Sequence, residues 1–208
     1  MSIIFLHGNG RAGAAAWPAQ GHMPDAVFLE REGQVDDPYR DAERILEHAA
    51  TAPAHLVAAS YGALAALLAV EQAPDRFQTL TLCEPAALTL SRHRPATADY
   101  VTRLRPVFDQ PDLSDLEFSR AFAAVEGRPP GLTDEQLAAS ARILRQITPP
   151  WTVEVCAPPV SVPTLVLTGG SRAICQLPGP EGPGLKEPWL TRPRHQKGGQ
   201  TDVYVARK

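Results

Sequence analysis

Short hydrophobic runs alternate with helix-like segments over the first 88 residues of the chain. Continuous apolar runs, typical of strands that are buried on both faces, occur at Ile3–Leu6, Ala26–Leu29, His55–Ala59 and Thr79–Cys83. Segments with the pattern of a helix lie between the later runs, at Tyr39–Ala50 and Ser60–Ala73. This alternation predicts an α/β fold, with a mostly parallel sheet and helices on both of its faces.

The middle of the chain follows a different pattern, because residues 89–159 contain no strand-like run. Ser114–Glu117 and Thr133–Gln136 each fit a capping box that opens a helix, and residues 97–108 also have a helical pattern. Val162–Gly170 then resumes the sheet with a fifth strand and a glycine turn. We therefore predict a core formed by residues 1–88 and 160–208, interrupted by a helical cap insertion at residues 89–159.

Composition and charge narrow the class of protein. The chain has 208 residues, of which 44% are hydrophobic, and a net charge of -3, which suits one globular domain with no nucleic-acid partner. No apolar stretch approaches the ~20 residues of a membrane-spanning helix, and no secretory signal is recognisable. The three cysteines are irregularly spaced, which indicates reduced thiols and neither a disulfide framework nor a zinc site. We expect a cytoplasmic protein without a membrane partner.

The composition changes near residue 171. Residues 1–171 contain 13 Arg, no Lys and 20 acidic residues, whereas residues 172–208 contain 4 Arg, all 3 Lys and only 3 acidic residues. Prolines between 178 and 193 exclude a helix of normal length there, and Thr201–Ala206 could form one more strand. We treat residues 172–208 as an atypical tail and hypothesise a frameshift near codon 171. An uninterrupted reading frame in an independent isolate would contradict this hypothesis.

Ser60 is a candidate catalytic residue because of its place between a strand and a helix. It ends a predicted strand and precedes a predicted helix, and the small residues Ala58 and Gly62 flank it at a distance of two. Such a serine sits on a tight, strained turn that lifts its hydroxyl above the sheet at a helix N-terminus. The backbone N–H of Tyr61 would then point at an oxyanion formed on Ser60.

A glycine-containing loop, His7-Gly8-Asn9-Gly10, follows the first strand. Glycines at such a place allow backbone N–H groups to turn inward, and the N–H of Asn9 is the natural second oxyanion donor. Two donors and an exposed serine are the parts that acyl transfer requires.

Together, these segments resemble the α/β-hydrolase superfamily. The resemblance is carried by the order and spacing of four stretches: Phe5–Gly10, Leu56–Phe77, Thr79–Ala86 and Val162–Gly170. It covers residues 3–88 and 160–170, as a short form that begins at the family's third strand. It implies that Ser60 is the nucleophile and that Asn9 and Tyr61 form the oxyanion hole. A serine at this position argues against the mechanism of haloalkane dehalogenases and epoxide hydrolases, which use an aspartate.

The resemblance also implies an acid and a base. Family members commonly carry the acid after the strand that matches 164–168, but this chain has Gly169-Gly170-Ser171-Arg172 there. Some members carry it after the preceding strand, where this chain has Glu84, which we take as the acid. The expected base is His195, the only histidine beyond residue 170, although the family's usual Gly-His pattern is absent around it. His7 in such proteins organises its loop.

The implied function is that of a serine hydrolase. It would cleave an ester, thioester, amide or related bond of a small-molecule acyl substrate through an acyl-enzyme on Ser60, without metal or organic cofactor. The alternatives are a non-catalytic or truncated hydrolase-fold protein that lacks a functional base, and a proton-abstracting lyase. Apolar positions of 97–148 and Trp151 are interpreted as the core of the cap, which would shape a pocket over the serine.

Overall fold

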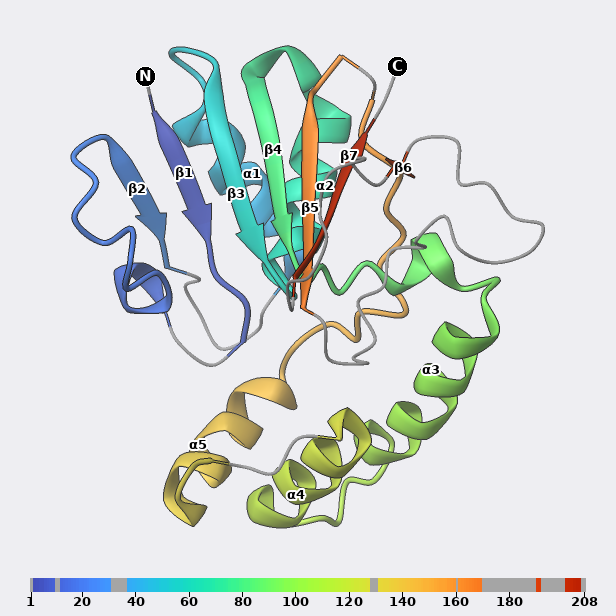
Figure 1. Ribbon diagram of the computed structural model, residues 1–208. Coiled ribbons are helices and arrows are strands. Elements are labelled where there is room, and N and C mark those ends of the chain that lie inside the picture. The colour runs from blue at the N-terminus through green and yellow to red at the C-terminus, as the bar shows by residue number, and fades with distance from the viewer. Residues whose placement is uncertain are drawn as a thin grey trace.

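The computed structural model describes residues 2–9, 12–30, 37–127, 131–159 and 161–169, together with the backbone of residues 190–191 and 201–206. Within these residues, one sheet contains seven strands in the order β2-β1-β3-β4-β5-β7-β6 (Figure 1). The strands are β1 Ile3–Leu6, β2 Ala26–Leu29, β3 Ala54–Ala59, β4 Phe77–Cys83, β5 Thr164–Gly169, β6 Leu190–Thr191 and β7 Thr201–Ala206. Of the predicted tail at 172–208, residues 172–189, 192–200 and 207–208 lie outside the described part, with His195 among them.

The first five strands pair in parallel, and the last two are antiparallel. β1 lies between β2 and β3, while β4 lies between β3 and β5, and all four pairings are parallel. β7 runs antiparallel to β5, and β6 runs antiparallel to β7. The predicted α/β class with a mostly parallel sheet is therefore confirmed.

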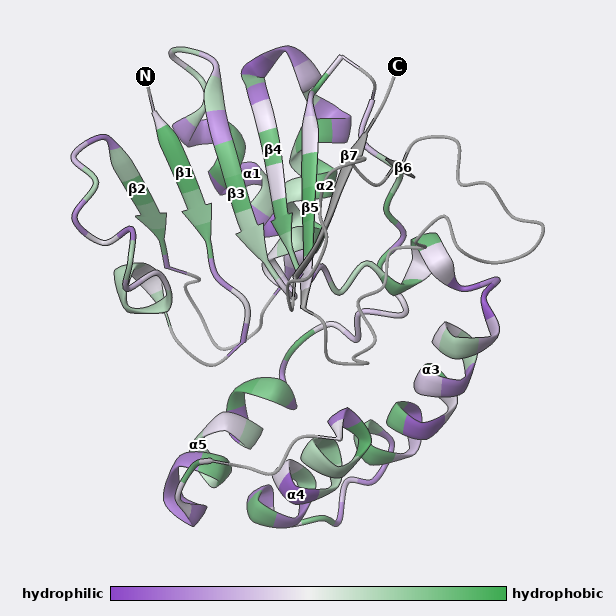
Figure 2. Ribbon diagram, viewed as in Figure 1, coloured by the Kyte–Doolittle hydropathy of each residue, from purple (hydrophilic) through white to green (hydrophobic). Residues whose placement is uncertain are grey.

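Alternate residues of the central strands face opposite sides of the sheet, and the two sides are buried to different extents. On β3 and β4, Leu56, Leu80 and Leu82 are at most 1% exposed, whereas His55, Val57 and Thr81 between or opposite them are half-buried. Figure 2 shows the hydrophobic colouring along most of β1, β2 and β5. The main core therefore forms on one side of the sheet.

The helices of the first half cover that side. α1 (Pro38–His48) begins at Asp37, whose side chain accepts a hydrogen bond from the N–H of Tyr39 over 2.9 Å. α2 (Gly62–Gln72) is apolar on nearly all sides, because it is enclosed by the sheet and by α1. Both helices lie behind the sheet in Figure 1, and they pack against each other. These two helices thus share one side of the sheet, because alternation along the chain does not determine on which side each crossover passes.

Three α-helices lie between β4 and β5 in the described residues. They are α3 (Pro95–Phe108), α4 (Asp115–Glu126) and α5 (Asp134–Leu144). Ser114 with Glu117 and Thr133 with Gln136 form the two predicted capping boxes. The helices lie beyond the carboxyl ends of the parallel strands (Figure 1). Short 3-10 helices at Gly13–Ala16, Pro74–Arg76 and Leu88–Ser91 complete the described elements. The designation of residues 89–159 as a cap domain stays a prediction.

An aromatic cluster holds these helices together. The ring of Phe108 on α3 lies 5.3 Å from that of Phe118 on α4 and 5.2 Å from that of Trp151, in edge-to-face geometry. The hydroxyl of Tyr61 donates to the carbonyl of Thr148 over 2.8 Å and so ties the segment after α5 to the start of α2. Trp151 thus packs in the helical core, as its sequence context indicates.

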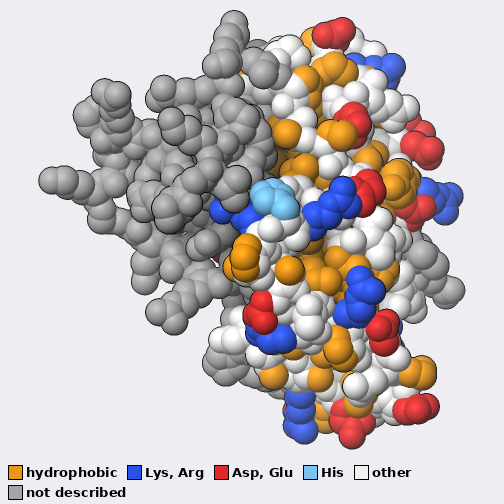
Figure 3. Space-filling view, turned by 90° about the vertical axis from the view of Figure 1, so that its right-hand side faces the viewer, with side chains coloured by type: hydrophobic (Ala, Val, Ile, Leu, Met, Phe, Trp, Pro, Cys, Tyr) orange, Lys and Arg blue, Asp and Glu red, His pale blue; other side chains and the backbone are white. Residues whose placement is uncertain are grey.

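The surface of the described part carries both charged and hydrophobic side chains. Figure 3 shows charged side chains of both signs interspersed with hydrophobic ones on the face that it presents. None of the helices in the described ranges combines the length and the apolar composition that a membrane crossing would require.

The burial of α2 leads to a stability prediction. Leu64 is 0% exposed on α2, whereas Leu132, before α5, is 51% exposed. We expect Leu64→Ala to lower the free energy of unfolding by about 2–5 kcal/mol, because it leaves a cavity between helix and sheet. Leu132→Ala, the same chemical change in an exposed place, should cost less than about 0.5 kcal/mol. Urea unfolding followed by circular dichroism measures both; equal losses would contradict the packing described.

Candidate active site

Ser60 lies on a strained turn between β3 and α2. Its φ angle is 49°, in the left-handed region that a residue with a Cβ adopts at a cost of about 1–3 kcal/mol. Three backbone hydrogen bonds hold it there. Its N–H donates to the carbonyl of Cys83 over 2.9 Å, and its carbonyl accepts from Ala63 at 3.1 Å and Ala86 at 3.0 Å. The conformation is therefore imposed by the neighbouring strand and by the first turn of the helix.

Two glycines allow the chain to pack tightly around this serine. A Cβ on Gly8 would lie 2.7 Å from the Cβ of Ser60, and a Cβ on Gly62 would lie 2.5 Å from the carbonyl oxygen of His7. Leu6 of β1 pairs with Ala58 of β3, so the loop after β1 runs directly beside the serine turn. Any side chain at either glycine would push the loop and the turn apart.

Glu84 follows β4 at the position next to Ser60. Ala59 pairs with Cys83 in the parallel register, so the two residues leave adjacent strands at the same level. Glu84 also has a positive φ, 46°, and its N–H donates to the carbonyl of Leu167 on β5 over 2.7 Å. Ser60 and Glu84 are the two non-glycine residues with positive φ in the described part of the chain. Strain of this kind often accompanies function.

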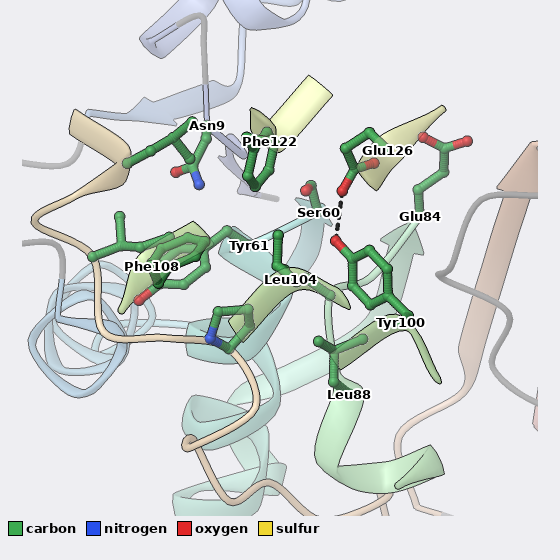
Figure 4. A pocket seen from close by; sticks show the side chains of 14 residues that line it. Asn9, Ser60, Tyr61, Glu84, Leu88, Tyr100, Leu104, Phe108, Phe122 and Glu126 are labelled. Atoms are coloured by element: carbon green, nitrogen blue, oxygen red, sulfur yellow. Dashed lines mark hydrogen bonds between the residues drawn. The ribbon is translucent and has the colours of Figure 1, made fainter. Parts of the chain in front are cut away.

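A cavity brings four of the five predicted site residues together. Ser60, Asn9, Tyr61 and Glu84 all line it (Figure 4). About 120 Å³ of it is available to the centres of water-sized molecules. A single water needs about 10–15 Å³ by this measure, so the cavity has room for a small organic group. His195, the fifth predicted residue, lies outside the described residues.

The remaining lining comes mainly from the helices between β4 and β5. These residues are Ala86, Leu88, Tyr100, Leu104, Phe108, Phe122, Glu126, Leu144, Ile147 and Pro150. Several of the apolar positions that the sequence assigned to the helical core thus also face the serine. The cavity is apolar over much of its wall, with a few polar groups, which is typical of a small-molecule site.

One feature of the site, the start of α2, favours negative charge at Ser60. The serine lies at the N-terminus of α2, where the positive end of the helix dipole stabilises negative charge. Burial, and secondly the charge of Glu84, raise the pKa of the neighbouring Cys83 thiol. Cys83 therefore stays protonated near neutral pH and is a poor nucleophile beside the serine.

Histidines contribute little to the described part of this cavity. None of the five at positions 7, 22, 48, 55 and 93 is among its described lining residues. His7 is buried and its Nδ1 donates to the carbonyl of Gly8 over 2.6 Å. That bond fixes the loop beside Ser60, in agreement with the organising role that the family resemblance implies for His7.

Tyr100 and Glu126 are polar lining residues that sequence reasoning missed. The hydroxyl of Tyr100 on α3 donates to Oε1 of Glu126 on α4 over 2.5 Å (Figure 4). A signal was present, because Tyr100, Leu104 and Phe108 repeat every four residues along one side of α3, as Phe122 and Glu126 do on α4. The spacing reveals a shared face, but it does not reveal that the face looks toward Ser60.

Comparison with known proteins supports the fold. No family model matches the chain, and no curated protein sequence matches it. Among solved structures, a Burkholderia cenocepacia protein provisionally assigned as an aryl esterase shares 20% identity over 81% of this chain and 71% of its own, with a TM-score of 0.50. A hydrolase from Pseudomonas aeruginosa (19% identity; 69% and 63% covered; TM-score 0.40) and one from Oleispira antarctica (15%; 70% and 62%; 0.49) are also similar.

These structural similarities bear on the fold of the chain and not on its activity. The chain spans less than two thirds of the length of the Pseudomonas and Oleispira structures. At 20% identity, the likeness to the Burkholderia protein shows the fold alone, which is the α/β-hydrolase fold that the sequence predicts. Activity has to be argued from the site itself.

The tight packing at Gly62 leads to a second stability prediction. Glycine-to-alanine changes in a helix normally stabilise by up to about 1 kcal/mol. Gly62→Ala should instead lower the free energy of unfolding by about 1–3 kcal/mol, because the new Cβ meets backbone of the β1 loop. Gly131→Ala, where a Cβ meets nothing within 4 Å, is the matched control. Urea unfolding of both variants decides the matter, and a stable Gly62→Ala would show that the loop does not approach the turn so closely.

Proposed function

We propose that this protein is a serine hydrolase that cleaves an ester, thioester, amide or related bond of a small molecule through an acyl-enzyme on Ser60. The observation that carries the proposal is the strained serine at the N-terminus of α2, opening into a mostly apolar cavity. A residue with a Cβ at positive φ costs stability, and three backbone hydrogen bonds hold Ser60 in that conformation. Exposure of its hydroxyl to a substrate is a function that can account for the cost.

In the proposed reaction, Oγ of Ser60 attacks the substrate carbonyl carbon. The carbonyl π-electron pair moves to oxygen, and the N–H groups of Asn9 and Tyr61 are proposed to bind the resulting oxyanion. Collapse of the tetrahedral intermediate expels the alcohol, thiol or amine and leaves an ester on Ser60, which water then hydrolyses. A single oxyanion donor typically contributes about 10²–10³-fold in rate.

Proton transfer completes the proposed mechanism. His195 would take the proton of Ser60 and pass it to the leaving group, and Glu84 would orient the imidazole. Glu84 is supported in this role by its place beside Ser60 at the ends of paired strands and by its positive φ. His195 lies outside the described residues, so its proposed role rests on the resemblance of the sequence to the α/β-hydrolase superfamily.

A second candidate function is favoured by one observation. No histidine is among the described lining residues of the cavity. Without a base, the same cavity would serve a binding protein with the hydrolase fold, and only about 10³–10⁴-fold catalysis over water would remain from the oxyanion hole and binding. The two candidates differ in the reactivity of Ser60 and can be distinguished by it.

Covalent labelling with a fluorophosphonate tests the proposal without a guess about the substrate. Its phosphorus forms a bond to an activated serine oxygen and releases fluoride. We expect one adduct in the intact mass of the wild-type protein and none in Ser60→Ala. Ser140→Ala, a serine on α5 that does not line the cavity, should label like the wild type. A folded wild-type protein that forms no adduct would contradict the hydrolase and favour the binding protein.

The roles of the acid and the base can be measured in the same assay. His195→Ala and Glu84→Gln should each lower the second-order rate constant of labelling by between about 10²- and 10⁴-fold, because proton removal from Ser60 then loses its acceptor or the acceptor's orientation. Circular dichroism checks that both variants fold. Unchanged labelling of His195→Ala would assign the base to a different group.

A further inference from the structure

The polar part of the cavity wall is acidic. Glu84 and Glu126 both line it, and among the described lining residues there is no Lys, Arg or His. Arg103 of α3 is paired with Asp99 over 3.1 Å and donates to the carbonyl of Val125 over 3.4 Å, and it is not among the described lining residues. The described lining thus contains two carboxylates and no cationic side chain.

The carboxylate of Glu126 is held in place by Tyr100. The tyrosine is only 5% exposed, and its hydroxyl donates to Oε1 over 2.5 Å. An ionised carboxylate has about four acceptor sites, so one donor leaves Glu126 most of its capacity to accept from or attract a ligand. A buried tyrosine that orients a carboxylate into a cavity limits the loss of side-chain entropy when a ligand binds.

Aromatic rings supply a second, independent feature of the same wall. Tyr100, Phe108 and Phe122 all line the cavity, and the rings of Phe108 and Phe122 lie 6.3 Å apart. The faces of aromatic rings attract cations within about 6 Å, and alkylated ammonium groups are recognised by such rings combined with carboxylates. Leu104 and Ile147 add aliphatic surface that suits a methylene spacer.

We infer that this cavity selects substrates that carry an ammonium group, including a quaternary one, separated by a short apolar spacer from the bond that is cleaved. Glu126 is the specificity-determining residue, and Tyr100 is the residue that positions it. The inference rests on the proposed function for the bond that is cleaved, but the preference for a cation follows from the wall of the cavity alone. Repulsion from Glu126 disfavours anionic esters.

A pair of esters that differ in charge but not in shape tests this inference. They are p-nitrophenyl 4-(trimethylammonio)butanoate and its carbon isostere, p-nitrophenyl 5,5-dimethylhexanoate. We expect wild-type kcat/KM to favour the cationic ester by about tenfold, and the preference to fall with added NaCl. Glu126→Gln keeps the shape and a hydrogen-bond acceptor for Tyr100, and it should bring the two values within about threefold of each other. Glu43→Gln, on the exposed side of α1, removes the same charge elsewhere and should leave the ratio unchanged.

A binding measurement separates failure of the inference from failure of the proposed function. Butyltrimethylammonium is titrated into the intact protein and observed by ligand NMR, with Glu126→Gln and Glu43→Gln alongside. Binding that is lost only in Glu126→Gln supports the cation site even if Ser60 forms no fluorophosphonate adduct, an outcome that would contradict the hydrolase alone. Hydrolysis of both esters at equal kcat/KM, without binding of the cation, would overturn the inference and leave the hydrolase standing. If Glu126→Gln does not fold, a wild-type ester ratio that is independent of NaCl overturns the inference.

Discussion

The close approach of three chain segments around Ser60 is the constraint on which the rest of the site depends. The β1 loop, the β3 end and the β4 end meet there, and Gly8 and Gly62 leave no room for a Cβ. Hydrogen bonds from Ser60 to Cys83, and from Ala86 back to Ser60, lock the turn to the neighbouring strand. Because the backbone hydrogen bonds of Ser60 go to the end of β4 and to the first turn of α2, the sheet and that turn fix its position.

The site thus has two parts, the strand ends that carry Ser60 and Glu84 and the helical wall that would contact the substrate. Ser60 and Glu84 stand at the ends of adjacent parallel strands, where their strained backbone is compensated by sheet pairing. The opposite wall comes from α3 and α4 and from the segment after α5, whose aromatic packing is centred on Phe108. Changes on the helical wall can alter what is bound without moving the serine, as is general for sites that are carried by a common fold.

The features that could be predicted from sequence were the local ones. Hydrophobic runs located β1 to β5, capping residues located the starts of α4 and α5, and the serine turn was recognisable from the small residues around Ser60. What depends on distant contacts was not predictable. The alternation of strands and helices did not show that α1 and α2 share one side of the sheet, and the spacing of Tyr100 and Leu104 did not show that they face the serine. Those facts are set by crossover geometry and by tertiary packing, which leave no short-range pattern.

The two parts of the site are coupled through charge. Carboxylates that line a confined cavity raise the free energy of any oxyanion formed beside them, since electrostatic repulsion is strong where water is scarce. The N-terminus of α2 and the proposed N–H donors oppose that cost at Ser60. A substrate that brings a positive charge against Glu126 would neutralise part of the repulsion at the moment of binding. In the proposed reaction, recognition of a cation and stabilisation of the transition state would therefore reinforce each other, whereas a neutral substrate of the same shape would gain only its apolar contacts.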